Sequence, residues 1–290
     1  MHEQLATIGA TCLNCGAELA GPFCSGCGQK AVHPKPTLHE LLHDALEEFL
    51  HFDGKIVQTL RTLVTKPGQL TLDVVAGRRA RYIAPLRLYL TISVLFFVVA
   101  AVTPTRGITV TVTDPGKGVG ASVQNTKRPM TDEEKRKFLE DNEKQAPRFL
   151  QPLIHRVIQD PVGLTRDVFA TWPKAMFVLL PVFAVIVAAF FHRRHFVEHL
   201  YFALHVHAFA FLVTAVNSTI GLAHIRWVSI PLGIVVMIWV PLYVHFAFKR
   251  VYGGSHVLTL AKETGVAVLY GIAMVPAIFV AALWVAAHPR

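Results

Sequence analysis

The stretch Trp172–Asn217, WPKAMFVLLPVFAVIVAAFFHRRHFVEHLYFALHVHAFAFLVTAVN, decides the fold because it contains two long apolar runs joined by a basic hinge. The first run, Ala175–Phe191, contains no charge, and the hinge is the tetrapeptide His192–His195. The second run, His199–Leu222, contains three histidines. An ionisable group in hydrocarbon is costly unless it faces a partner, water or a metal. The stretch therefore predicts two membrane spans, the second with candidate functional residues.

The composition of the whole chain indicates the same class of protein. Of its 290 residues, 53% are hydrophobic and 16% are charged, and the mean hydropathy is +0.45. These values are typical of a membrane protein and not of a soluble domain. The formal net charge is +9, but the basic residues cluster beside apolar runs. We therefore expect membrane lipids, and not nucleic acid, as partners.

Five apolar stretches have the length of about 17–25 residues that a membrane span requires. They are Leu86–Val102, Ala175–Phe191, His199–Leu222, Val228–Phe248 and Thr264–Ala287. Clusters of arginine and lysine precede the first span, follow the second and follow the fourth. Because basic residues favour the cytoplasmic side, this pattern predicts a membrane protein with a cytoplasmic N terminus and an extracytoplasmic C terminus.

The N-terminal segment contains two CxxCG motifs separated by eight residues. Their cysteines are Cys12, Cys15, Cys24 and Cys27. In such a motif two thiolates bind one face of a tetrahedral ion, and the glycine lets the backbone turn toward sulfur. A cytoplasmic location disfavours disulfides. We therefore predict a structural zinc site in a small ribbon whose folding depends on the metal, and we expect the ribbon to contact a protein partner.

A helical hairpin next to the membrane is predicted after the ribbon. Thr37–Phe52 has a capping box and an apolar stripe at helical spacing, and a second stripe covers Ile56–Val64. The first helix contains a literal HExxH at His39–His43, a pattern known from zinc peptidases. Since Glu40 is explained as a cap and no third ligand is evident, we interpret this motif as part of a capped amphipathic helix.

Two further segments carry a resemblance to a known family. They are Asp53–Phe97, DGKIVQTLRTLVTKPGQLTLDVVAGRRARYIAPLRLYLTISVLFF, and Glu198–Phe209, EHLYFALHVHAF. Together with the cysteine motifs, they resemble bacterial inner-membrane proteins of unknown function that carry a zinc ribbon. The resemblance covers most of the chain and implies a bacterial inner-membrane location and this architecture, but no chemistry. The family pattern does not require histidines at positions 39 and 43, which further weakens the peptidase interpretation.

The loop after the first span is expected to lie outside the cytoplasm. Ile108–Thr113 alternates like a strand, Asp114–Lys127 is polar and rich in glycine, and a charged helix is predicted over Thr131–Lys144. A shorter amphipathic helix is predicted over Phe149–Gln159. No catalytic spacing occurs in the loop. A spacer or a partner-binding segment, partly disordered or of α+β type, is therefore expected.

The predicted fold is an all-α integral membrane protein with five transmembrane helices and two small appended parts. Its parts are a cytoplasmic zinc ribbon (1–33), a juxtamembrane amphipathic hairpin (34–85), a first transmembrane helix (86–102), an extracytoplasmic loop (103–171) and a four-helix transmembrane bundle (172–290).

Ionisable residues gather near the predicted cytoplasmic ends of the spans. The candidates for a second polar or metal site are His195, Glu198, His199, His205, His207 and His245. On a regular helix Glu198 and His205 share a face, whereas His205 and His207 point to opposite sides. One helix therefore cannot supply all the ligands of an ion. Glu198 and His205 are the candidates for catalysis, and Arg87 is a candidate contact for an anionic lipid headgroup.

Three functions remain open at this point. The first is a membrane adaptor or regulatory component whose histidines form hydrogen bonds between helices. The second is a lipid or small-solute binding or transport protein with a polar pocket. The third is a membrane metalloenzyme that acts on a lipid and holds a second metal, iron or zinc. No complete catalytic constellation is visible, so a non-enzymatic adaptor is the leading prediction.

Overall fold

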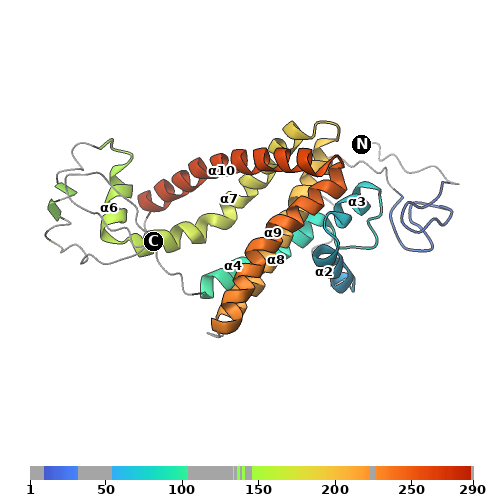
Figure 1. Cartoon of the computed structure of the whole chain (residues 1–290), viewed down its shortest axis with the longest axis horizontal. Coiled ribbons are helices and arrows are strands. Elements are labelled where there is room, and N and C mark those ends of the chain that lie inside the picture. The colour runs from blue at the N-terminus through green and yellow to red at the C-terminus, as the bar shows by residue number, and fades with distance from the viewer. Residues whose placement is uncertain are drawn as a thin grey trace. The chain divides into compact units, whose positions relative to one another are not determined.

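The computed structural model describes residues 10–31, 54–103, 146–222 and 226–288, with a few residues between 133 and 140. The chain divides into two compact units, one formed by 1–103 and 180–270 and the other by 104–179 and 271–290. The described residues are mostly helical, and they contain isolated β-bridges but no strand (Figure 1). The predicted HExxH helix, the strand Ile108–Thr113 and the glycine-rich segment lie outside the described residues.

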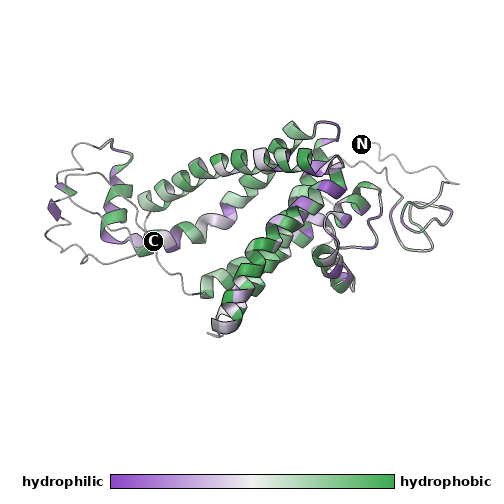
Figure 2. Ribbon diagram, viewed as in Figure 1, coloured by the Kyte–Doolittle hydropathy of each residue, from purple (hydrophilic) through white to green (hydrophobic). Residues whose placement is uncertain are grey.

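Within the described residues, five helices are long and apolar enough to cross a membrane, which agrees with the predicted number of spans and indicates a membrane protein. They are α4 (Pro85–Val102), α7 (Pro161–Phe190), α8 (Phe196–Leu222), α9 (Arg226–Tyr252) and α10 (His256–Ala287). Apolar residues dominate these five helices, whereas polar residues are frequent in α2 and in the turns (Figure 2).

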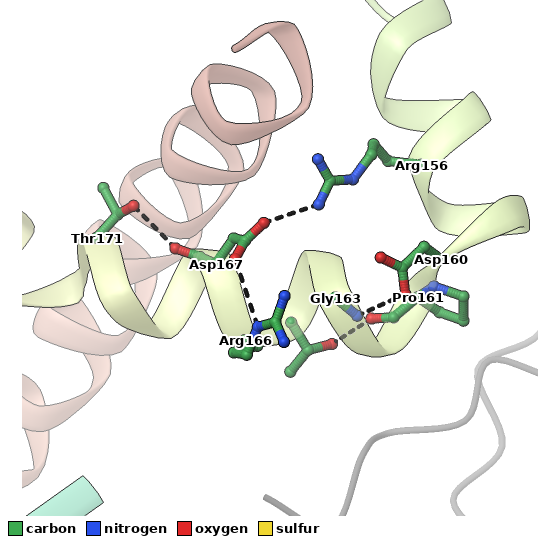
Figure 3. A network of polar contacts seen from close by, with 8 residues as sticks. Arg156, Asp160, Pro161, Gly163, Arg166, Asp167 and Thr171 are labelled. Carbon is green, nitrogen blue, oxygen red and sulfur yellow. Dashed lines mark hydrogen bonds and ion pairs between the residues drawn. The ribbon is translucent and has the colours of Figure 1, made fainter. Parts of the chain in front are cut away.

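Helix α7 begins well before the apolar run that predicted it, because the residues around its start form a helix cap (Figure 3). The Asp160 carboxylate accepts a 2.8 Å hydrogen bond from the Gly163 amide, as an N-cap residue does, and a proline occupies the first helical position. A 2.7 Å ion pair between Arg156 and Asp167 joins α7 to α6 (Gln151–Gln159). Helix α6 is the short amphipathic helix expected before the second span.

Helix α8 is the centre of the first unit. It contacts α4 and α9 as well as the short helices α2 (Ile56–Thr65) and α3 (Gln69–Val75). Of an apolar 18-residue stretch within α8, 67% is buried. Phe202 and Phe209 are completely buried in the core. A helix that is apolar on all sides is expected to lie inside a bundle. The stretch that dominates the sequence is thus also the one around which the unit packs.

The turn between α2 and α3 fits closely against α9. Gly68 in this turn has φ +74°, and a Cβ atom there would lie 2.9 Å from the backbone oxygen of Ala247. The Arg250 guanidinium donates a 2.7 Å hydrogen bond to the Pro67 carbonyl in the same turn. The α2–α3 turn therefore covers the C-terminal end of α9.

Several polar contacts bring helix ends together. Lys262 near the start of α10 donates to the carbonyl of Phe190 at the end of α7, at 2.9 Å. Arg194 before α8 donates to the carbonyl of Val251 at the end of α9, at 2.7 Å. We call the region where α7 and α9 end and where α8 and α10 begin the basic end of the unit.

Candidate functional site

The four cysteines come together in the described N-terminal segment. One ligand atom from each lies within 4.8 Å of the others, and the Sγ–Sγ distances are 3.6 Å for Cys12 and Cys27 and 3.4 Å for Cys15 and Cys24. A tetrahedron of sulfurs about 2.3 Å from zinc has edges of about 3.8 Å. The thiols are free, and a disulfide would require about 2.0 Å. This arrangement fits a four-coordinate metal ion.

The two halves of this segment repeat the same backbone pattern twelve residues apart. The amide of Gly16 donates to the carbonyl of Cys12 at 2.8 Å, and the amide of Gly28 donates to that of Cys24 at the same distance. Both glycines have positive φ, 78° and 72°. This is the tight turn that the CxxCG spacing predicts, since a glycine adopts this conformation without a Cβ penalty.

The local chemistry of the cysteine cluster suits a metal site. A hydrogen bond from the Asn14 side chain lowers the pKa of the Cys27 thiol to about 6, which favours the thiolate there. At Cys15, a backbone hydrogen bond at Ala17 is outweighed by contacts with Cys24 and Cys27, which raise the pKa of the Cys15 thiol. Thiolates are the form that binds metals. Four cysteine ligands would fill a tetrahedral ion completely, so a metal held here would organise the fold of the segment and leave no position for a substrate.

The cysteine segment is attached to the loop between α3 and α4 mainly by one side chain. The Gln29 amide group donates to the carbonyl of Gly77 at 2.8 Å and accepts from the amides of Arg79 and Ala80, both at 3.0 Å. A Cβ atom at Gly77, where φ is +80°, would lie 2.5 Å from a methyl carbon of Leu13. Both halves of the cysteine segment therefore contact this loop.

The loop in turn is held to α3 by Asp73. Asp73 is 3% exposed. Its carboxylate accepts hydrogen bonds from Arg78 at 3.2 Å and from the Tyr82 hydroxyl at 3.0 Å. Gln69 donates to the same carboxylate at 3.1 Å. A buried carboxylate is stable only when it is paired and hydrogen-bonded, as here. A continuous set of contacts therefore runs from the cysteine segment to α3.

Each histidine of α8 has its own separate partner. His205 Nδ1 lies 2.9 Å from Thr71 Oγ1 of α3, and His199 Nδ1 lies 2.9 Å from the Tyr252 hydroxyl of α9. His199 is completely buried, and its Nε2 atom has no hydrogen-bond partner in the described part of the chain. These two histidines join α8 to two different elements.

His207 uses both of its ring nitrogens. Nδ1 lies 2.8 Å from the carbonyl of Ala203 and Nε2 lies 3.1 Å from the Tyr270 hydroxyl of α10. A carbonyl oxygen only accepts, so Nδ1 carries the proton, and in the neutral ring Nε2 accepts from the tyrosine. No lone pair of a neutral His207 is then left for a metal.

His245 forms a chain of contacts at the start of α10. Its Nδ1 lies 2.9 Å from a Glu263 carboxylate oxygen and its Nε2 lies 3.1 Å from Nδ1 of the exposed His256. The carboxylate orients the His245 ring, and His256 contacts the other ring nitrogen. His245 was a candidate from the sequence, and its contact with Glu263 is added by the structure.

The remaining candidates also lie apart. Glu198 forms an ion pair with Arg194 at 2.9 Å, His195 is exposed in the turn before α8, and Arg87 is half-buried on α4. Among the described residues, the four cysteines are the group of three or more metal-ligating side chains whose ligand atoms converge. The histidines and Glu198 are thus distributed over separate contacts.

The described chain is therefore a helical membrane protein with five candidate spans and a separate four-cysteine cluster that is able to bind a metal. A family model described as "Protein of unknown function (DUF3667)" matches residues 53–97, which include α2, α3, the loop that Gln29 contacts and the first part of α4. No curated protein and no solved structure matches the chain. The match is consistent with an uncharacterised family.

Proposed function

We propose that the protein is an adaptor or regulatory component of a bacterial inner membrane, in which a cytoplasmic zinc ribbon presents a partner-binding surface. The observation that carries this proposal is the attachment of the cysteine segment to the loop at Gly77–Ala80 through Gln29. The Asp73 contacts connect this loop to α3, and Thr71 connects α3 to His205 in the centre of the bundle. A metal bound by the four cysteines would thereby be linked to the helices.

The exposed side of the ribbon supplies an apolar contact for a partner protein. Phe23, between the two CxxCG motifs, is 59% exposed. Gln29, in contrast, holds the ribbon to the loop. An exposed aromatic side chain is a common anchor in protein interfaces. The membrane histidines serve as hydrogen bonds between helices in this proposal, and the enzyme alternative loses support because the candidate ligands do not converge.

Limited trypsin digestion of the full-length protein in detergent tests the link between ribbon and loop. Arg78, Arg79 and Arg81 are cleavage sites within the loop that the ribbon contacts. We expect the metal-loaded protein to be cleaved slowly there, and both Cys24→Ser and Gln29→Ala to be cleaved faster. Gln29→Ala should retain its zinc, whereas Cys24→Ser should lose it.

Glu18→Ala is the control, because Glu18 is an exposed residue of the same cysteine segment. This variant should keep both the zinc and the slow cleavage. Equal protection of the loop in the wild type, in Gln29→Ala and after removal of zinc would sink the proposed link.

A further inference from the structure

A pocket of about 340 Å³ opens at the basic end of the first unit. It is lined by the end of α7, the turn before α8, the end of α9 and the first turns of α10. Neither the cysteine segment nor any histidine of α8 lines it. The pocket is therefore separate from the cysteine cluster, and it shares Tyr252 with the His199 contact described above.

The lining of the pocket carries an excess of positive charge. Arg193, Arg194 and Lys262 line it, and none of the lining residues is acidic. One carboxylate, that of Glu198, pairs with Arg194 at 2.9 Å. Arg193 is exposed and has no ion-pair partner within the described residues. Such a concentration of cationic side chains favours an anionic ligand.

Two of the cationic side chains are held in place by other contacts. Arg194 donates to Glu198 and to the Val251 carbonyl, and its guanidinium lies 5.9 Å from the centre of the Tyr252 ring. Lys262 donates to the Phe190 carbonyl, and its ammonium lies 4.7 Å from the centre of an adjacent phenylalanine ring. An arginine has five N–H donors and a lysine has three, so each retains donors for a ligand.

The other walls of the pocket suit a ligand at the surface of a membrane. Phe190, Phe191 and Tyr252 supply aromatic surface where the apolar helices begin and end. The turn at Gly253–Gly254, with φ +72° and +91°, brings backbone without side chains to the opening. Polar headgroups of lipids occupy this depth, between the hydrocarbon and water.

We propose that this pocket binds a phosphate group, carried either by an anionic lipid headgroup or by a soluble phosphate compound. Arginine and lysine are the usual ligands of phosphate, and Arg193, Arg194 and Lys262 supply both. The proposal concerns residues that the adaptor function does not use, so it stands independently of the zinc ribbon and of any partner of the ribbon.

Native mass spectrometry of the full-length protein tests this site. Phosphatidylglycerol, phosphatidylcholine and inorganic phosphate are titrated separately into the wild type, the single variant Arg193→Gln and the double variant Arg193→Gln/Lys262→Gln. The matched control is Arg61→Gln/Lys66→Gln, which removes the same charge from exposed positions around the α2–α3 turn. Thermal unfolding of each variant establishes that it is folded.

We expect the double variant to bind its phosphate ligand at least about tenfold more weakly than the control, since charge-assisted contacts are lost. Arg193→Gln alone should weaken binding in the same direction, so the test does not depend on Lys262, which also contacts α7. A preference for phosphatidylglycerol over inorganic phosphate assigns a lipid headgroup, and the reverse assigns a soluble compound in the same pocket. Equal weakening in the control would overturn the site.

Discussion

Thr71 and His205, which are 134 positions apart in the sequence, share a buried hydrogen bond of 2.9 Å between Oγ1 and Nδ1. Thr71 is completely buried and His205 is 4% exposed. A histidine in the middle of an apolar run thus has its partner on α3, outside the five candidate spans. This contact explains the presence of one polar side chain in the most buried helix without any metal.

Thr71→Val should lower the stability of the protein by about 1–3 kcal/mol, because it leaves a buried ring nitrogen of His205 unsatisfied. Thermal unfolding in detergent measures the change. Thr214→Val is the control, since the exposed Thr214 donates only to the carbonyl of Ala210 in its own helix, at 2.7 Å. Equal losses in the two variants would contradict the role given to the Thr71 contact.

Metal analysis of the purified protein should find one zinc per chain, bound by the four cysteines. Cys24→Ser should lose this zinc, because a tetrahedral site with one thiolate missing binds the ion far more weakly. Glu198→Gln and His205→Ala should both retain it, since neither residue lies in the cysteine cluster. A second metal that disappears with His205→Ala would instead favour the metalloenzyme alternative.

Gly68→Ala should destabilise the protein more than Gly253→Ala does. The two glycines have nearly the same φ, +74° and +72°, so both substitutions carry the left-handed backbone penalty of about 1–2 kcal/mol. A Cβ at position 68 would also lie 2.9 Å from the Ala247 backbone oxygen, whereas one at position 253 meets nothing within 4 Å. Because α9 must move, we expect at least about 1 kcal/mol more for Gly68→Ala, measured by thermal unfolding. Indistinguishable melting temperatures would show that the turn does not pack on α9.

Tyr82→Phe should reduce the loss of stability at alkaline pH. Burial, followed by the hydrogen bond to Asp73, raises the pKa of Tyr82 above its usual value of about 10. The folded state then holds the phenol proton more tightly than the unfolded state. This contribution is fully present below about pH 10 and is lost as the pH rises through the higher folded pKa.

Melting temperatures of the wild type and Tyr82→Phe, compared from about pH 8 to about pH 11, measure this difference. The wild type should lose more stability at the upper end of the range. Parallel curves would mean that the phenol titrates alike in both states of the protein, and the buried Tyr82–Asp73 contact would then be wrong.

The five candidate spans were predictable because hydropathy and length are local properties of the sequence. The close approach of the four cysteines was also predictable, since the CxxCG spacing sets the turn at Gly16 and Gly28. The start of α7 was not predicted, because the helix begins at the Asp160 cap, about four turns before the apolar run. Helix caps extend a helix beyond the hydrophobic signal that identifies it.

The partners of the histidines could not be predicted from the same patterns. Helical spacing shows which residues share a face, but His205 and His207 find hydroxyl groups on α3 and α10, far away in the sequence. Threonine and tyrosine are too common in the sequence for their positions to predict such a contact. The role of Gln29 was not predictable either, because an isolated glutamine belongs to no motif.

Gln29 forms its hydrogen bonds with the main chain of the loop and not with its side chains. The glutamine binds a carbonyl and two amides, groups that every residue except proline offers. Exchanges at Arg79 and Ala80 would therefore leave these hydrogen bonds intact, whereas Gly77 has no substitute beside Leu13. The charge of this loop is therefore able to change while the cysteine segment stays attached to it.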